Sequence, residues 1–122
     1  MSEKPYKVII TPFAEASLQQ YDDYLRFELY ADQAADDWID LFENSVKELA
    51  FFPAKYPLVS NEPWHSEGVH SFPVKGQMIY YWISDERMKV YVMDVVSQRM
   101  DQNKRLIESQ ITFYQEMLKG LE

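Results

Sequence analysis

Six side chains in the second half of the chain are of the types that carry out acid–base and phosphate chemistry. Cleavage of RNA through its own 2′-hydroxyl needs a proton acceptor, a proton donor for the leaving oxygen and fixed positive charge at the phosphate. Arg99 stands three residues after the end of an apolar run, and the end of a strand is a natural place for a site. The side chains that could supply these functions are Arg99, Lys75, Lys89, His70, Tyr80 and Tyr81.

Each of these side chains also has an ordinary structural interpretation. Arg99 could be a surface arginine that pairs with an acid such as Asp94 or Asp101. Lysines are common on edge strands, where they oppose association with other strands. The sequence therefore leaves open whether the chain is an enzyme, and the catalytic candidates are Arg99, Lys75, Lys89 and Tyr80.

We expect neither a metal site nor a bound cofactor. His65 and His70 lie near Glu62 and Glu67, but their spacing fits no standard pattern of metal ligands. The chain has no cysteine, and its three glycines are too far apart to form a phosphate-binding loop.

The composition predicts one domain, residues 1–122, with a packed core. The 122 residues are 47% hydrophobic and 16% aromatic. Residues 12–52 hold ten acidic side chains against two basic ones, which accounts for the whole net charge of −8. Because acidic surfaces repel nucleic acid, we expect no sequence-specific binding to it. The polar start and the lack of a run of about 20 apolar residues predict a cytoplasmic protein without a membrane span.

Local patterns predict the elements that hold these residues. Thr11 and Pro12 end a short strand over 6–11 and form a good helix start, and apolar residues at 14, 18, 21 and 25 share one helical face. A second helix begins near Asp32 and ends before Pro53, so the two form a helical hairpin. A loop over 53–67 leads to a strand over 69–75.

Two apolar runs, residues 77–84 and 88–96, are rich in β-branched and aromatic residues and predict a β-hairpin. A last helix over 102–121 follows a core of residues 6–101. Its expected apolar stripe is Ile107, Ile111, Tyr114, Leu118 and Leu121, with Leu106, Phe113 and Met117 beside it. The order β-α-α-β-β-β-α makes this an α+β fold, with the helical hairpin on a small antiparallel sheet.

Strand alternation assigns the residues of the first apolar run to two faces. Ile79, Tyr81 and Ile83 share one face, which we expect to meet the helical hairpin. Met78, Tyr80 and Trp82 share the other face, and an exposed apolar patch of this kind needs a partner or a cover. The final helix should either cover this face within the chain or form a homodimer with another copy.

Three stretches resemble the RelE/ParE superfamily of bacterial toxins from type II toxin–antitoxin (plasmid stabilisation) systems. YKVIITPFAEASLQQYDDYL, residues 6–25, is similar to the first strand and first helix of that family. LAFFPAKYPLV, residues 49–59, resembles the end of its second helix and the following loop. The stretch from 75 to 101 is similar to its last two strands and its terminal arginine motif. The resemblance implies a compact toxin-like fold and a cognate antitoxin as partner.

The resemblance also shows where this chain departs from its family. The family commonly has arginine at the positions of Met78, Trp82, Asp94 and Met100, and often histidine at Ser97. Arg99 is the one basic residue of this set that remains. In the ribosome-dependent RNase branch such cations bind the transcript, so their loss favours the ParE branch, which is associated with inhibition of DNA gyrase.

The sequence therefore predicts a ParE-like toxin that acts by protein–protein contact, with a contact surface formed by Met78, Tyr80, Trp82, Asp94 and Arg99. The alternatives are a RelE-like mRNA endonuclease that works on the ribosome, and a non-toxic relative that serves as an interaction or oligomerisation module.

Overall fold

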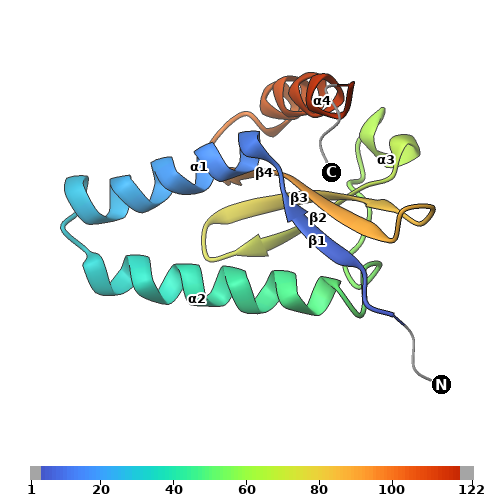
Figure 1. The fold of residues 1–122 in the computed structure, drawn as a ribbon. Coiled ribbons are helices and arrows are strands. Elements are labelled where there is room, and N and C mark those ends of the chain that lie inside the picture. The colour runs from blue at the N-terminus through green and yellow to red at the C-terminus, as the bar shows by residue number, and fades with distance from the viewer. Residues whose placement is uncertain (1–3, 119–122) are drawn as a thin grey trace.

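The computed structural model describes residues 4–118, apart from the side chains of residues 103, 114 and 118. The observed order confirms the predicted α+β arrangement and adds one short helix within the loop before the sheet (Figure 1). The elements are β1 (Lys7–Ile10), α1 (Pro12–Asp23), its π-helical continuation η1 (Tyr24–Glu28), α2 (Asp32–Leu49), α3 (Trp64–Glu67), β2 (Val69–Val74), β3 (Gln77–Ser84), β4 (Lys89–Ser97) and α4 (Gln102–Leu118).

The strands form one sheet in the order β1-β4-β3-β2. The pairings of β2 with β3 and of β3 with β4 are antiparallel, as predicted, whereas β1 lies parallel to β4. A parallel pairing needs a long crossover connection, and the helices and strands between β1 and β4 supply it. Tyr80 pairs with Asp94 and Tyr81 pairs with Val92, so Met93 is an extra residue that makes a β-bulge.

The helical hairpin covers one face of the sheet. Thr11 caps α1 as predicted, because its Oγ1 accepts a hydrogen bond from the amide of Ala14 at 3.3 Å and donates one to the carbonyl of Val92 at 2.9 Å. Asp32 does not cap α2: the cap position is Ala31, which makes no side-chain bond. Trp38 of α2 ties the hairpin to the sheet, because its Nε1 donates to the carbonyl of Val74 at 2.9 Å.

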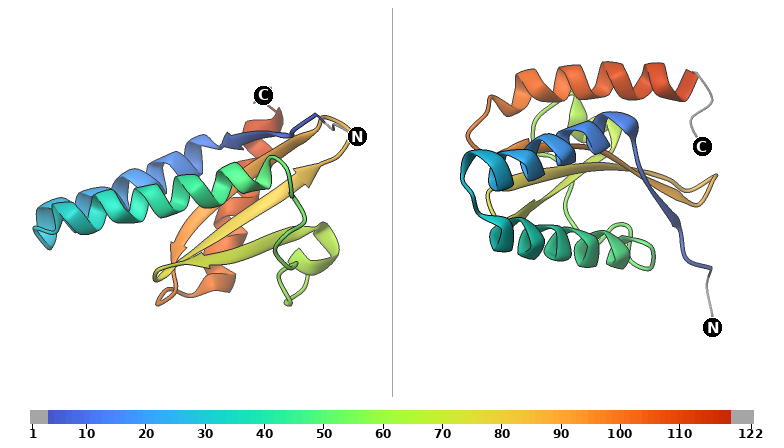
Figure 2. Two further views of the ribbon diagram at one scale, coloured as in Figure 1. Left: turned by 90° about the horizontal axis from the view of Figure 1, so that it is seen from below. Right: turned by 60° about the vertical axis from the view of Figure 1, so that its left-hand side comes forward.

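The closed end of the hairpin extends beyond the sheet, as the left-hand view of Figure 2 shows. Here α1 continues as a π-helix, and Tyr30 turns the chain with a left-handed φ of 51°. Sequence patterns gave no sign of this π-helix. The overhang matters because residues of η1 and of the end of the sheet line one cavity there.

α4 covers the opposite face of the sheet within the same chain, which is the first of the two arrangements predicted for it (Figure 1). The predicted stripe was wrong in its rotation. Ile107 and Ile111 are 53% and 54% exposed, whereas Leu106 and Phe113, placed beside the stripe, are buried against the sheet. The side chains of residues 114 and 118, and all of Leu121, lie outside the described residues.

Polar contacts, rather than the apolar pattern, determine which side of α4 faces the sheet. Ser109 and Arg105 on α4 both face a buried carboxylate on β4, and this places Leu106 and Phe113 inward. Among residues 4–118, no helix is long and apolar enough to cross a membrane.

Candidate functional site

The predicted catalytic candidates do not converge. Lys89 begins β4, and Arg99 follows its other end, about 25 Å away at the usual rise of a strand. Lys75 lies nearer, in the two-residue turn before β3, where the carbonyl of Gly76 accepts a hydrogen bond from the amide of Gln98 at 3.0 Å. Lys75 is exposed in this turn and does not line a cavity with Arg99.

The histidine and tyrosine candidates have structural contacts. His70 stacks on Tyr81, with ring centroids 4.9 Å apart, and its Nδ1 lies 2.8 Å from the carbonyl of Tyr56. The hydroxyl of Tyr81 donates to the carbonyl of Pro53 at 2.8 Å. Neither side chain is near Arg99 in the lining of a cavity, so the structure does not assemble the expected set of acid, base and cation.

Tyr80 lies on the opposite face, 3% exposed, and its hydroxyl donates to Gln102 Oε1 at 2.6 Å. Burial, together with the negative charge of Asp94, raises the pKa of Tyr80 to about 12. The phenol is therefore protonated at neutral pH and is not placed to accept a proton from a substrate.

The residues predicted to form one contact surface occupy three different environments. Met78 and Trp82 are partly buried in the apolar cluster beneath α4, and Tyr80 is buried there too. Asp94 is fully buried, and Arg99 is exposed after the end of β4. A partner could reach Tyr80 or Asp94 only if α4 moved away.

Asp94 is held in a polar cluster that we call the Asp94 cluster: Ser17 of α1, Asp94 of β4, and Arg105 and Ser109 of α4. The carboxylate accepts hydrogen bonds from Ser17 Oγ at 2.7 Å, Arg105 Nε at 2.7 Å and Ser109 Oγ at 2.5 Å. It also accepts one from the amide of Val95 at 2.8 Å. Asp94 directly follows the bulge residue Met93. Through these hydrogen bonds Asp94 connects β4 with α4 and with α1, so its role is structural.

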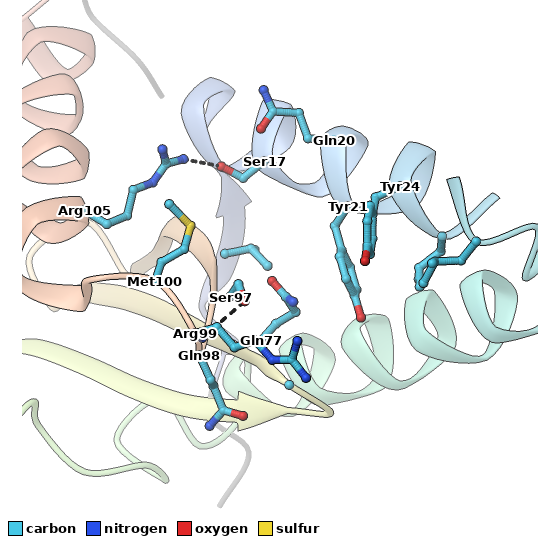
Figure 3. Close-up of a pocket in the computed structure, with 14 residues that line it drawn as sticks. Ser17, Gln20, Tyr21, Tyr24, Gln77, Ser97, Gln98, Arg99, Met100 and Arg105 are labelled. Atoms are coloured by element: carbon cyan, nitrogen blue, oxygen red, sulfur yellow. Dashed lines mark hydrogen bonds between the residues drawn. The ribbon is translucent and has the colours of Figure 1, made fainter. Parts of the chain in front are cut away.

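The Arg99 cavity lies at the end of the sheet, beneath the overhanging end of the hairpin, and Ser17 and Arg105 of the Asp94 cluster belong to its lining (Figure 3). Its volume is about 600 Å³, and its walls include Tyr21, Tyr24, Leu29, Gln77, Arg99 and Met100. Figure 3 shows the ring of Tyr21 from α1 and the ring of Tyr24 from η1 on one side of the cavity, with Gln77 and Arg99 on the sheet side. The volume is within the usual range for ligand sites.

Of the two arginines that line the Arg99 cavity in the described part of the chain, Arg99 is the one available to bind a ligand. Within residues 4–118 its guanidinium makes no ion pair, so neither Asp94 nor Asp101 is its partner. The other arginine of the lining, Arg105, is bound to Asp94 and donates to Ser17 Oγ at 2.8 Å. Burial raises the pKa of Tyr21, against a hydrogen bond with Gln77 that lowers it, so this wall is uncharged at neutral pH.

Sequence reasoning found Arg99 but missed the residues around it. Tyr21 was expected only as a core residue, and Tyr24, Gln77 and Arg105 were not expected at the site. One signal was present for Arg105: an aspartate inside the apolar run 90–96 must find a buried cation or donor. No pattern indicated the cavity, because the overhang depends on the length and the π-helical end of the hairpin.

Comparison with protein families gave one match over most of the chain. The model for the ParE toxin of the type II toxin–antitoxin system, parDE, matches residues 8–102, which extends from β1 to the start of α4. A sequence comparison with curated proteins gave no match.

Solved structures with this fold include two toxin–antitoxin complexes. A chain of the chromosomal ParDE system from P. aeruginosa is 15% identical, with a TM-score of 0.60 over 75% of this chain and 95% of that one. A chain of the RelBE2 complex from Mycobacterium tuberculosis is 18% identical, with a TM-score of 0.54 over 77% of this chain and 99% of that one. At these identities the likeness establishes the fold.

Proposed function

The chain belongs to the family of ParE toxins from type II toxin–antitoxin systems, and we propose on this premise that it acts as ParE-like toxins do, by protein–protein contact. Its target is an essential protein such as DNA gyrase, in the cytoplasm, and a cognate antitoxin neutralises it as part of a plasmid-stabilisation system. The Arg99 cavity is the surface through which it recognises a partner. Contact of Tyr80, Met78, Trp82 and Asp94 with a partner would be secondary, since α4 covers them.

The observation that carries this proposal is the chemistry of the Arg99 cavity. It offers one available guanidinium among neutral amides, phenols and apolar side chains, which is the composition of a recognition surface. A phosphoryl-transfer site needs several charges fixed around one phosphate and a proton acceptor within hydrogen-bond reach. The part of the chain that the structure describes contributes no histidine, lysine or carboxylate to the lining as that acceptor.

The RelE-like alternative requires Arg99, Lys75, Lys89 and Tyr80 to act on one transcript. The length of β4 separates Lys89 from Arg99, and Tyr80 is buried, so both observations weigh against the endonuclease. The acidic helical hairpin weighs against it further, because ten acidic side chains in residues 12–52 repel a polyanion such as mRNA.

A non-toxic interaction module is the second candidate, and one observation favours it. Ile107 and Ile111 form an exposed apolar pair on the outer side of α4, which would suit a homodimer. The pair is small, so this role ranks below the ParE-like one.

One experiment separates these functions. The full chain is induced in bacteria beside an Arg99→Ala variant, and growth, transcript integrity and plasmid supercoiling are followed. Growth arrest with intact transcripts and altered supercoiling, weakened by Arg99→Ala, is the expected result. Cleaved transcripts would establish the endonuclease instead, and unimpaired growth with a folded protein would leave the interaction module. An Arg87→Ala variant, altered at the exposed β3–β4 turn, is the matched control.

A further inference from the structure

The Arg99 cavity is built for one negative charge. Arg99 has no ion pair within the described part of the chain, and Arg105 is neutralised by Asp94. Among residues 4–118, no lysine and no acid lines the cavity. A single guanidinium pairs best with a single carboxylate or phosphate, which can accept two parallel hydrogen bonds from its fork.

The surrounding charge selects among anions. α1 and η1 contribute residues to the cavity lining, and together with α2 they carry ten acids and two bases, so any ligand that extends along the hairpin meets a negative field. Nucleic acid has a charge at each nucleotide and gains affinity by meeting many cations. One cation beneath an acidic overhang therefore suits a ligand with one isolated negative charge and a neutral remainder.

The walls show what that neutral remainder is. Tyr24, Leu29 and Met100 line the cavity and are between 49% and 52% exposed. Apolar side chains that stay half exposed around a cavity are a surface for burial by a partner. A metabolite small enough to fill the cavity would leave this rim in water, whereas a protein segment passing over it would cover the rim.

Neutral polar groups complete the lining. The side chains of Gln20, Gln77 and Gln98 carry amides, each with both a donor and an acceptor. Amides of this kind hydrogen-bond to the peptide groups of an extended segment, which present the same donor and acceptor pair. They have no preference for phosphate.

From these features we infer that the Arg99 cavity binds a segment of the antitoxin in which a carboxylate lies next to a bulky apolar side chain. The carboxylate pairs with Arg99, and the apolar side chain lies among Tyr21, Tyr24 and Leu29. The identity of the partner rests on the proposed toxin function, whereas the ligand chemistry rests on the cavity alone.

Three small probes test the ligand chemistry in the full chain. N-acetyl-tryptophan has a carboxylate beside an apolar ring, its carboxamide analogue lacks only the charge, and the dinucleotide ApU has one phosphodiester. Each probe is titrated into isotope-labelled protein, and amide chemical shifts give the site and the dissociation constant. N-acetyl-tryptophan should shift residues of the Arg99 cavity and bind about tenfold more tightly than the carboxamide, as expected for one charge-assisted hydrogen-bonded pair.

Variants of the protein test which cavity residue contacts the carboxylate and which contacts the apolar group of the ligand. Arg99→Gln should abolish the preference for the carboxylate over the carboxamide, and Tyr24→Ser should weaken both probes alike. Arg87→Gln, which removes the same charge at the β3–β4 turn, should change neither affinity. Equal binding of acid and carboxamide, shifts confined to another surface, no binding of any probe, or tighter binding of ApU would each overturn the inference, the last in favour of RNA.

The two proposals fail separately. A chain that does not arrest growth but selects the carboxylate through Arg99 refutes the toxic function and retains the ligand chemistry. A toxic chain whose cavity does not select the carboxylate retains the toxic function and refutes the ligand chemistry.

Discussion

Replacing Arg105 with methionine should lower the free energy of unfolding by about 3 kcal/mol. Arg105 Nε donates to Asp94 Oδ2 at 2.7 Å, and Asp94 is fully buried, so the variant leaves a buried carboxylate without its cation. Loss of one partner from a buried ion pair costs about 3–5 kcal/mol. The lower end applies because Ser17, Ser109 and the amide of Val95 still donate to the carboxylate, and because the Arg105 side chain is 21% exposed.

Urea unfolding followed by tryptophan fluorescence measures this change as a lower midpoint with an unchanged slope. Arg87→Met is the matched control and should stay within about 0.5 kcal/mol of the parent. Asp94→Asn combined with Arg105→Met should cost at least about 1 kcal/mol less than the two single changes added together, because the double variant has no buried charge. A loss below about 1 kcal/mol for Arg105→Met, or an additive double variant, would refute the structural role of the Asp94 cluster.

Three further perturbations test separate parts of the fold. Phe113→Ala should cost about 3–5 kcal/mol and raise binding of a hydrophobic dye, since Phe113 of α4 is buried against the sheet, whereas Ile111→Ala on the exposed side should change the urea midpoint little. Thr11→Ala should cost about 1–2 kcal/mol in the same assay, because it removes the cap of α1 and a hydrogen bond to β4. The raised pKa of Tyr80, about 12, means that the folded state keeps the phenol proton that the unfolded chain loses near pH 10, so stability should fall between about pH 10 and 12. Tyr80→Phe should make that fall shallower, and an unchanged slope would contradict the assignment.

The elements could be predicted because their local signals agree with their tertiary contacts. Thr11 and Pro12 start α1, and alternation along β3 separates Ile79 from Tyr80 onto opposite faces. Local sequence patterns could not predict the parallel pairing of β1 with β4, because these are the first and last strands in the sequence. The rotation of α4 was missed because Asp94 draws Arg105 inward, and this polar contact outweighs the exposure of Ile107.

Among the residues of the candidate site, only Arg99 could be predicted from the sequence. Arg99 marks the end of β4 in the sequence as it does in the structure. Met78 and Trp82 were placed on the correct face, but the cavity formed at the end of the sheet, between η1 and the connection from β4 to α4. Its position depends on the overhang of η1, which local patterns do not encode, since the same residues would suit an ordinary helix end.

If the chain recognises its antitoxin through Arg99, the affinity of the cognate antitoxin depends on that side chain. Calorimetric titration of the antitoxin into the parent chain, the Arg99→Gln variant and the Arg87→Gln control gives three dissociation constants. Loss of a hydrogen-bonded charge pair worth about 1.5–3 kcal/mol should weaken binding to Arg99→Gln by about 10- to 150-fold and leave the control unchanged. An Arg99→Gln chain that binds the antitoxin as tightly as the parent would contradict the account.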